Sequence, residues 1–118
     1  MTILIRLNEL CVNFLACRAV AYCDLSTGLV LCSSSQYKLP QEQLDRLGLM
    51  AGDVLDGDQI LVNPVQSAIV VQDNTICVVL RSTAQPGEAL SCDCEIDIDL
   101  VKFCLAAENT LIAIGSST

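Results

Sequence analysis

Residues 18–35 constrain the fold more than any other part of the chain, because they read as a β-hairpin without a polar face. The first strand, 18–24, has small or apolar side chains pointing both ways: Ala19, Ala21 and Cys23 on one side, and Val20 and Tyr22 on the other. After a turn over 25–28, in which Gly28 can adopt the left-handed conformation of a short loop, the chain returns over 29–35. Strands that are apolar on both faces are covered on both faces. The hairpin is therefore predicted to lie centrally in a sheet.

Three segments have the spacing of amphipathic helices, with apolar residues three or four positions apart. The first covers 3–14, and its apolar stripe is Ile3, Leu7, Leu10, Cys11 and Phe14. The second follows Pro40, and its pattern is predicted to break at Gly52 and Gly57; its stripe is Leu44, Leu47, Ala51 and then Val54 or Leu55, with Leu49 and Met50 on its flanks. The third ends near Gly115 and has Asp97 or Asp99 as N-cap; its stripe is Leu100, Cys104, Ala107 and Leu111.

Two strands are predicted after the second helix. Residues 53–58 carry three carboxylates and are predicted to form a solvated turn, and the connection continues through Ile60-Leu61-Val62 and Asn63-Pro64. The run 68–71 then reads as a buried strand, and a two-residue turn at Asp73-Asn74 returns the chain into 75–80. This second strand is apolar throughout, so we expect it to be covered on both faces.

The last predicted strand, 92–98, has the clearest period in the chain, because apolar and acidic residues alternate along it. It follows a turn at Pro86-Gly87. Its apolar face consists of Cys92, Cys94, Ile96 and Ile98, and the acidic residues are Asp93, Glu95, Asp97 and Asp99. A wholly charged face is exposed to solvent, and such charges discourage pairing between sheet edges, so an edge position suits this strand.

Composition limits the classes of partner. The chain has 118 residues, of which 53% are hydrophobic, above the ~45–50% of an ordinary globular domain, so an interface is expected. With 14 acidic and 6 basic residues, the net charge of −8 excludes nucleic acid and anionic membranes, because both require a basic face. No apolar run approaches the ~18 residues of a membrane span, and residues 1–9 lack the pattern of a signal peptide. A cytoplasmic location is predicted.

The eight cysteines are predicted to be thiols that pack in the core. They contain no C-x-x-C pair and the chain has no histidine, so no metal site of standard form is expected. A reducing compartment disfavours disulfides. Cys92 and Cys94 share one strand face and could hold a soft metal or form a redox pair, but neighbouring acids raise a thiol pKa, which argues against reactivity.

The order read from these patterns is helix, two strands, helix, three strands, helix. This order, the opening helix that leads directly into 19–24, and the hairpin Asp24-x-x-x-Gly28 followed by Leu29-Val30-Leu31 resemble the roadblock / dynein light chain family. The resemblance covers nearly the whole chain and implies one profilin-like α+β domain over 1–118. The implied architecture is a central five-stranded antiparallel sheet with helices on both faces.

The sequence argues against an enzyme. It contains no histidine base, no G-x-x-x-x-G-K phosphate loop and no G-x-S-x-G nucleophile turn, so no catalytic residue and no cofactor is predicted. The family resemblance implies a non-catalytic dimeric scaffold that regulates a Ras-like small GTPase or organises a larger complex. The alternative is a ligand-binding or sensory profilin-like module, which requires a pocket with convergent polar groups. A cysteine-based metal or redox protein is the third possibility.

A homodimer is predicted through the second helix and the strand at about 60–72. Two helices cover one face of the sheet, and the second helix alone is too short to cover the other. A second copy would cover it, with the helices antiparallel and the strands joined edge to edge. The predicted interface residues are Leu44, Leu47, Met50, Ala51, Ile69 and Val71.

Overall fold

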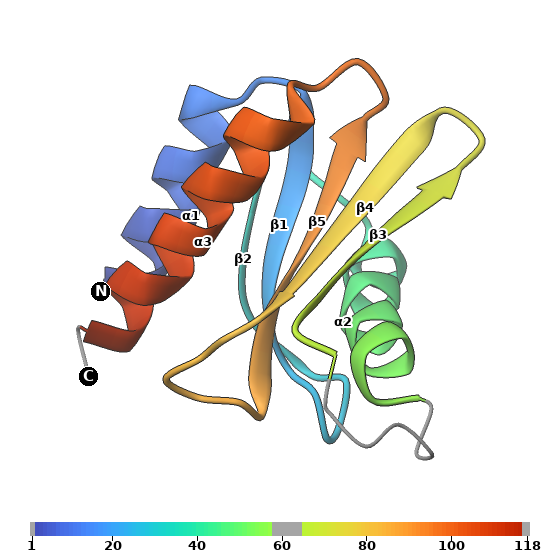
Figure 1. Ribbon diagram of the computed structural model, residues 1–118. Coiled ribbons are helices and arrows are strands. Elements are labelled where there is room, and N and C mark those ends of the chain that lie inside the picture. Colours follow the sequence, from blue (N-terminus) through green and yellow to red (C-terminus); the bar gives the residue numbers. More distant parts are fainter. Residues whose placement is uncertain (1, 58–64, 117–118) are drawn as a thin grey trace.

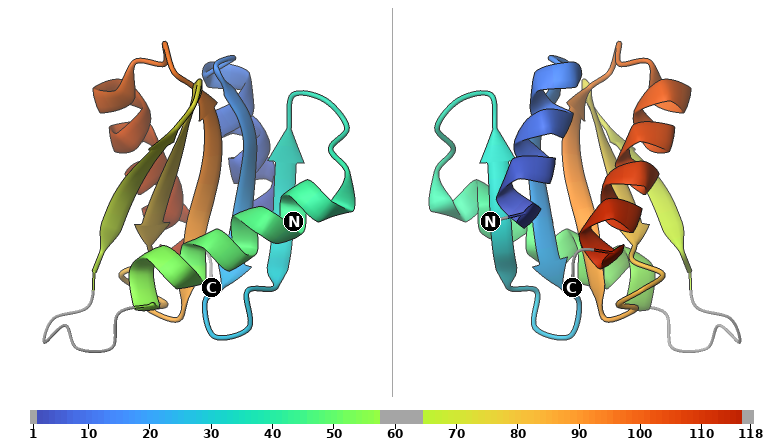
Figure 2. Two further views of the ribbon diagram at one scale, coloured as in Figure 1. Left: turned by 90° about the vertical axis from the view of Figure 1, so that its right-hand side faces the viewer. Right: turned by 90° about the vertical axis from the view of Figure 1, so that its left-hand side faces the viewer.

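The computed structural model describes residues 2–57 and 65–116 and has the predicted α+β architecture (Figure 1). Five antiparallel strands form one sheet in the order β2-β1-β5-β4-β3. The elements follow the chain in the predicted order: α1 (Thr2–Asn13), β1 (Cys17–Asp24), β2 (Val30–Ser35), α2 (Gln41–Asp56), β3 (Ser67–Gln72), β4 (Thr75–Arg81), β5 (Glu88–Glu95) and α3 (Leu100–Ser116). Helices α1 and α3 cover one face of the sheet and α2 crosses the other (Figure 2). The predicted fold class is confirmed.

Strand β1 separates two apolar cores, as its sequence predicts, but β2 lies at the edge of the sheet, where Leu31 is 48% exposed, so the predicted central position is wrong for the second strand of the hairpin. Val20 and Tyr22 lie in the core beneath α1 and α3, whereas Ala19, Ala21 and Cys23 lie in the core beneath α2. Gly28 adopts the left-handed conformation, with a φ of 74°. The Asp24 carboxylate accepts hydrogen bonds from the Ser26 and Thr27 hydroxyls (3.1 and 2.9 Å), which stabilises the turn.

Helices α1 and α3 run antiparallel and side by side (Figure 1). Phe14, just after α1, contacts Phe103 of α3 edge to face, with 5.3 Å between the ring centroids. The buried residues of α3 are Phe103, Ala107, Leu111 and Ile114, so the predicted stripe is correct at Ala107 and Leu111 but only half-buried at Leu100 and Cys104. Of the two predicted N-caps, Asp99 accepts a hydrogen bond from the Lys102 backbone N–H (3.3 Å).

Helix α2 continues past Gly52, the first of the two glycines at which the sequence predicted a break, and ends before the second, Gly57, which is its C-cap. Gly48 and Gly52 face the β1–β2 turn, and a methyl group at these positions would lie 2.2 Å from the Gly28 carbonyl oxygen and 3.1 Å from the Leu25 carbonyl oxygen. These glycines are therefore contact residues of the helix and do not end it. The turn predicted for 53–58 is wrong for 53–56, which are helical, and residue 58 lies outside the described residues.

The positions predicted from the sequence for two strands of the sheet are wrong. The run 68–71 was predicted to be buried, but β3 lies at the edge, where Ile69 and Val71 are 49% and 62% exposed. The acidic strand was predicted at 92–98 and suited to an edge, but β5 spans Glu88–Glu95 and occupies the centre. Residues 96–98 turn away toward α3, which leaves Ile96 exposed. The acidic side of β5 is tolerated at the centre because Asp93 forms an ion pair with Arg18 of β1 (2.8 Å).

A buried arginine, Arg81 at the end of β4, ties three connections together. Its guanidinium donates hydrogen bonds to the carbonyl oxygens of Leu55 (3.2 Å), Val65 (3.0 Å) and Pro86 (2.8 Å), and it forms an ion pair with Asp56. It thereby joins the end of α2, the approach to β3 and the β4–β5 turn.

Among the described residues, no helix has the length and apolar character needed to cross a membrane.

Candidate functional site

The six residues predicted to form a dimer interface do not share one surface. Leu47 and Ala51 are buried against the chain's own sheet, 8% and 0% exposed, so they are not available to a second copy. Leu44 and Met50 are half-buried on α2. Ile69 and Val71 are exposed on β3, and the remainder of the strand predicted at 60–72, residues 60–64, lies outside the described residues. The accessible part of the predicted interface is therefore the β3 edge with the flanks of α2.

The open edge of β3 offers backbone groups for pairing. The Arg81 N–H donates to the Gln66 carbonyl (2.7 Å), which marks residues 66 and 81 as a hydrogen-bonded pair of the antiparallel ladder. Alternation then directs the backbone groups of Ala68 and Val70 toward β4, and those of Ile69 and Val71 away from the sheet. An edge strand of this kind is a template for another strand.

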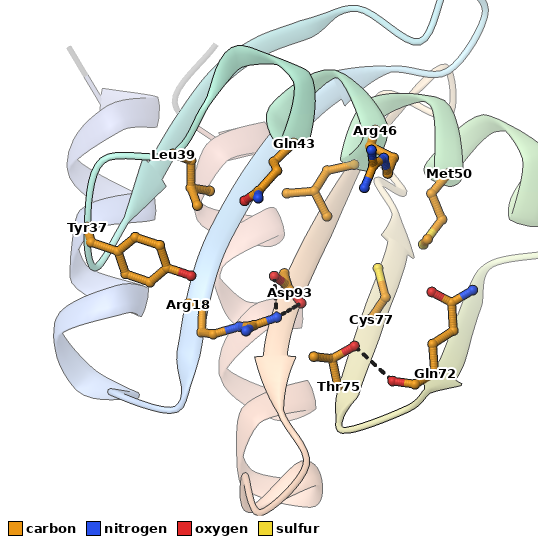
Figure 3. Close-up of a pocket in the computed structure, with 11 residues that line it drawn as sticks. Arg18, Tyr37, Leu39, Gln43, Arg46, Met50, Gln72, Thr75, Cys77 and Asp93 are labelled. Atoms are coloured by element: carbon orange, nitrogen blue, oxygen red, sulfur yellow. Dashed lines mark hydrogen bonds and ion pairs between the residues drawn. The ribbon is translucent and has the colours of Figure 1, made fainter.

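A cavity of about 280 Å³ lies between one flank of α2 and the sheet (Figure 3). Its walls come from five elements and the segment before α2; the lining residues include Arg18, Tyr37, Gln43, Arg46, Met50, Gln72, Thr75, Cys77 and Asp93. Its volume is close to the lower end of ligand pockets, which begin at roughly 300 Å³. We call this cavity the α2 pocket.

The α2 pocket is organised around an ion pair between neighbouring strands. The Arg18 Nη2 group donates to both carboxylate oxygens of Asp93, at 2.9 and 2.8 Å. This hydrogen bonding raises the pKa of Arg18 above its ordinary value. The Arg18 Nε–H is buried without an acceptor among the described residues, and the Tyr37 hydroxyl is directed toward the same guanidinium (Figure 3). The pocket therefore presents fixed polar groups that suit recognition.

The thiol in the α2 pocket is a poor nucleophile. Burial raises the pKa of Cys77 to about 11, although a hydrogen bond with Ser91 (3.6 Å between Sγ and Oγ) acts in the opposite direction. The thiolate is the reactive form, and a thiol with this pKa is protonated at neutral pH. The chemistry available in the pocket is therefore binding through hydrogen bonds and charge.

The remaining cysteines lie mainly in the cores. Cys11, Cys17, Cys92 and Cys94 are buried beneath α1 and α3, and Cys23 is buried with Cys77 beneath α2. A hydrogen bond from Cys17 lowers the pKa of Cys11 to about 7, and the same bond raises the pKa of Cys17. Over residues 2–57 and 65–116, no group of three or more histidine, cysteine or acidic side chains is arranged to hold a metal ion.

Buried thiols predict a loss of stability at alkaline pH. Burial raises the pKa of Cys23 to about 12 and that of Cys77 to about 11, whereas an unfolded thiol titrates near ~8.5. Above that value the unfolded state loses protons that the folded state keeps, so stability falls as pH rises. We expect these two thiols to lower the free energy of unfolding by roughly 2–4 kcal/mol between pH 8 and 10. Urea denaturation with a reductant measures this, and the C23A/C77A variant should show a shallower decline; an identical decline would contradict the assignment to these thiols.

Comparison with known proteins identifies the fold. No protein-family model and no curated protein matches the sequence. Among solved structures, the Roadblock/LC7 domain from Streptomyces avermitilis aligns with a TM-score of 0.82 at 15% sequence identity, and the alignment covers 97% of this chain and 95% of that chain. The chain has the roadblock fold.

Two further structures share the roadblock fold with this chain. The gliding protein MglB from Thermus thermophilus has a TM-score of 0.82 at 17% identity, covering 98% of this chain and 87% of that chain. MglC from Myxococcus xanthus has a TM-score of 0.71 at 12% identity, covering all of both chains. The resemblance read from residues 18–35 is thus confirmed for the fold.

Sequence reasoning missed the α2 pocket of this roadblock fold. Arg18 and Asp93 are 75 positions apart, and only the pairing of β1 with β5 brings them together. Tyr37 and Arg46 come from the segment before α2 and from α2 itself. One signal was present: Arg18 interrupts the otherwise apolar run 17–23, and a charge in such a position is expected to be paired.

Proposed function

We propose that this chain is a non-catalytic homodimeric scaffold that regulates a Ras-like small GTPase or holds one in a larger complex. The observation that carries the proposal is the open, apolar β3 edge, which is suited to pairing with a second copy. The roadblock fold and the family resemblance of the hairpin support the GTPase partner. A solved structure with the same fold is described as MglB with tetrameric arrangement (TM-score 0.80, 18% identity), and self-association is proposed here on that analogy.

In the proposed dimer, two β3 strands pair antiparallel and join both sheets. The outward backbone groups at Ile69 and Val71 would supply the hydrogen bonds. The two α2 helices then lie on the same face of the joined sheet. Leu44 and Met50 are the members of the predicted helix contact that retain exposed surface, so they replace Leu47 and Ala51 as candidates. The partner would bind a surface to which both copies contribute.

Replacing Ile69 with proline is expected to abolish the dimer. The substitution removes an N–H that points away from β4, so the chain's own ladder keeps its hydrogen bonds, and proline is tolerated at such edge positions. The I69T variant keeps this N–H and should remain dimeric. Light scattering at micromolar concentrations, with circular dichroism to verify folding, measures both. A folded I69P variant with the mass of a dimer would contradict pairing through β3.

The GTPase partner is tested with the same pair of variants. Purified Ras-like GTPases from the source organism, loaded with GDP or with a non-hydrolysable GTP analogue, are mixed with each protein and separated by size exclusion. We expect wild type and I69T to co-elute with one GTPase in one nucleotide state, and I69P to lose this association. If no GTPase in either nucleotide state binds the wild-type dimer, the scaffold proposal fails for this partner class.

The α2 pocket supports a second candidate function, a ligand-binding module. The observation in its favour is the buried Arg18 Nε–H, which lacks an acceptor among the described residues and would be satisfied by an oxygen of a ligand. Melting temperatures in the presence of small carboxylic acids, compared between wild type and an Arg18→Met variant, test this candidate independently of the dimer.

A further inference from the structure

The outer side of α3 carries an apolar stripe that none of the described residues covers. Val101, Leu105 and Ile112 are 73%, 57% and 60% exposed. With Glu108 they recur at i, i+4, i+7 and i+11, which places them on one side of the helix. Neighbouring apolar side chains that stay exposed in this way are typical of an interaction surface. This stripe therefore marks a surface for another element.

The stripe faces β3 across a hollow. Glu108, Leu111 and Ile112 line a cavity of about 230 Å³ together with Ser67 of β3 and Leu80 of β4. The side of α3 that bears the stripe is therefore turned toward the edge strand. Helix α1 packs on α3, and neither α1 nor α3 contacts β3 in the described residues.

Beside this hollow, the exposed side chains of β3 are also apolar. Ala68 and Val70 pack into the core beneath α2, so alternation along the strand places Ile69 and Val71 on the opposite face, the one that carries α3. We define the α3–β3 groove by these two floor residues and by the wall residues Val101, Leu105 and Ile112. Two helices cover most of this face and leave its last strand open, as Figure 1 shows.

We propose that the α3–β3 groove binds one amphipathic helix of a partner protein, a helix with basic residues beside its apolar stripe. Packed helices lie 8–10 Å apart, and strands are about 4.8 Å apart, so a helix beside α3 would lie over β3. The wall runs along α3 from Val101 to Ile112, about 17 Å at a rise of ~1.5 Å per residue. Glu108 in the wall and Asp73 in the adjacent β3–β4 turn give the groove an acidic border, consistent with the net charge of −8.

The groove belongs to a single chain and does not depend on the proposed dimer. If two copies pair through β3, their grooves meet across the two-fold axis and form one trough between the two α3 helices. The docking site would then be available on the face opposite α2. A partner helix and a GTPase bound on the α2 face would not compete.

The test uses a fluorescein-labelled 18-residue helical peptide, with leucines at i, i+3, i+4 and i+7 and lysines at most other positions, in 150 mM salt. Fluorescence anisotropy should show saturable binding to the wild-type protein. The L105S/I112S variant should bind at least tenfold more weakly, because it removes two residues of the wall. A matched variant, I5S/V12S, removes two exposed apolar residues of α1 outside the groove and should bind within twofold of wild type.

Two controls make the outcome decisive. All four substituted side chains are exposed, so the melting temperatures should match that of wild type. A peptide with glutamates in place of the lysines should bind at least tenfold more weakly. Absence of binding, equal binding by L105S/I112S and wild type, or equal weakening in I5S/V12S would overturn the proposal.

Discussion

The Gly48→Ala variant is expected to lose about 2–3 kcal/mol of folding free energy, although alanine is the better helix former. A methyl group at position 48 would lie 2.2 Å from the Gly28 carbonyl oxygen, well inside van der Waals contact. The Gly28 oxygen is a backbone atom, and the added methyl carbon is bonded directly to the backbone of α2. Neither can rotate away, so α2 would have to move away from the β1–β2 turn. Alanine returns at most ~1 kcal/mol of helix propensity, which is less than the cost of overpacking.

Urea denaturation of the Gly48→Ala variant measures this effect, and Gly87→Ala is its control. A methyl group at position 87 has no heavy atom within 4 Å, and Gly87 does not have a positive φ. Gly87→Ala should therefore change stability by less than ~0.5 kcal/mol, or increase it slightly by restricting the unfolded chain. If both variants were equally stable, α2 would lie farther from the turn than the 2.2 Å between the added methyl group and the Gly28 carbonyl oxygen implies.

The close contact at Gly48 also explains which parts of the fold the sequence could predict. Residues 18–24 have apolar side chains on both faces of the strand, which predicts burial on both faces. In the structure, both faces of β1 are buried. Gly52 was predicted to end α2 because glycine lowers helix propensity. Here the gain from packing Gly48 and Gly52 on the turn outweighs that cost. Whether a glycine ends a helix or lets it approach another element depends on contacts that lie 20 or more residues away in this chain.

The positions of β3 and β5 in the sheet were not predictable from their local patterns. Alternating acids suggested an exposed strand, but Arg18 neutralises Asp93 at the centre of the sheet. A continuous apolar run suggested burial, but Ile69 and Val71 are exposed at the edge. An apolar run does not distinguish a surface covered within the chain from one covered by a partner. The error at β3 is what the proposed dimer interface would produce when the chain is read alone.

Replacing Arg81 with methionine is expected to cost about 3–5 kcal/mol, the range for breaking a buried, hydrogen-bonded ion pair. Arg81 is 8% exposed and satisfies the carbonyl oxygens of Leu55, Val65 and Pro86 as well as pairing with Asp56. Methionine fills a similar volume but leaves these acceptors without their donor. The Leu55 carbonyl lies in the last turn of α2, where a cation is also favoured by the helix dipole.

Two comparisons separate the loss of the Arg81 hydrogen bonds from a simple loss of charge. Arg81→Lys keeps the charge but cannot direct donors along three fixed directions, so we expect it to recover less than half of the loss. Arg46→Met also removes an arginine, but the Arg46 and Glu42 side chains are exposed and form an i,i+4 pair, which contributes only about 0.3–0.5 kcal/mol. Urea denaturation of the three variants measures the differences. If Arg81→Met and Arg46→Met lost similar amounts, Arg81 would not hold α2, β3 and the β4–β5 turn together. Because Arg81 anchors the approach to β3, its loss should also weaken the proposed dimer in any variant that still folds, and light scattering at several protein concentrations would detect this.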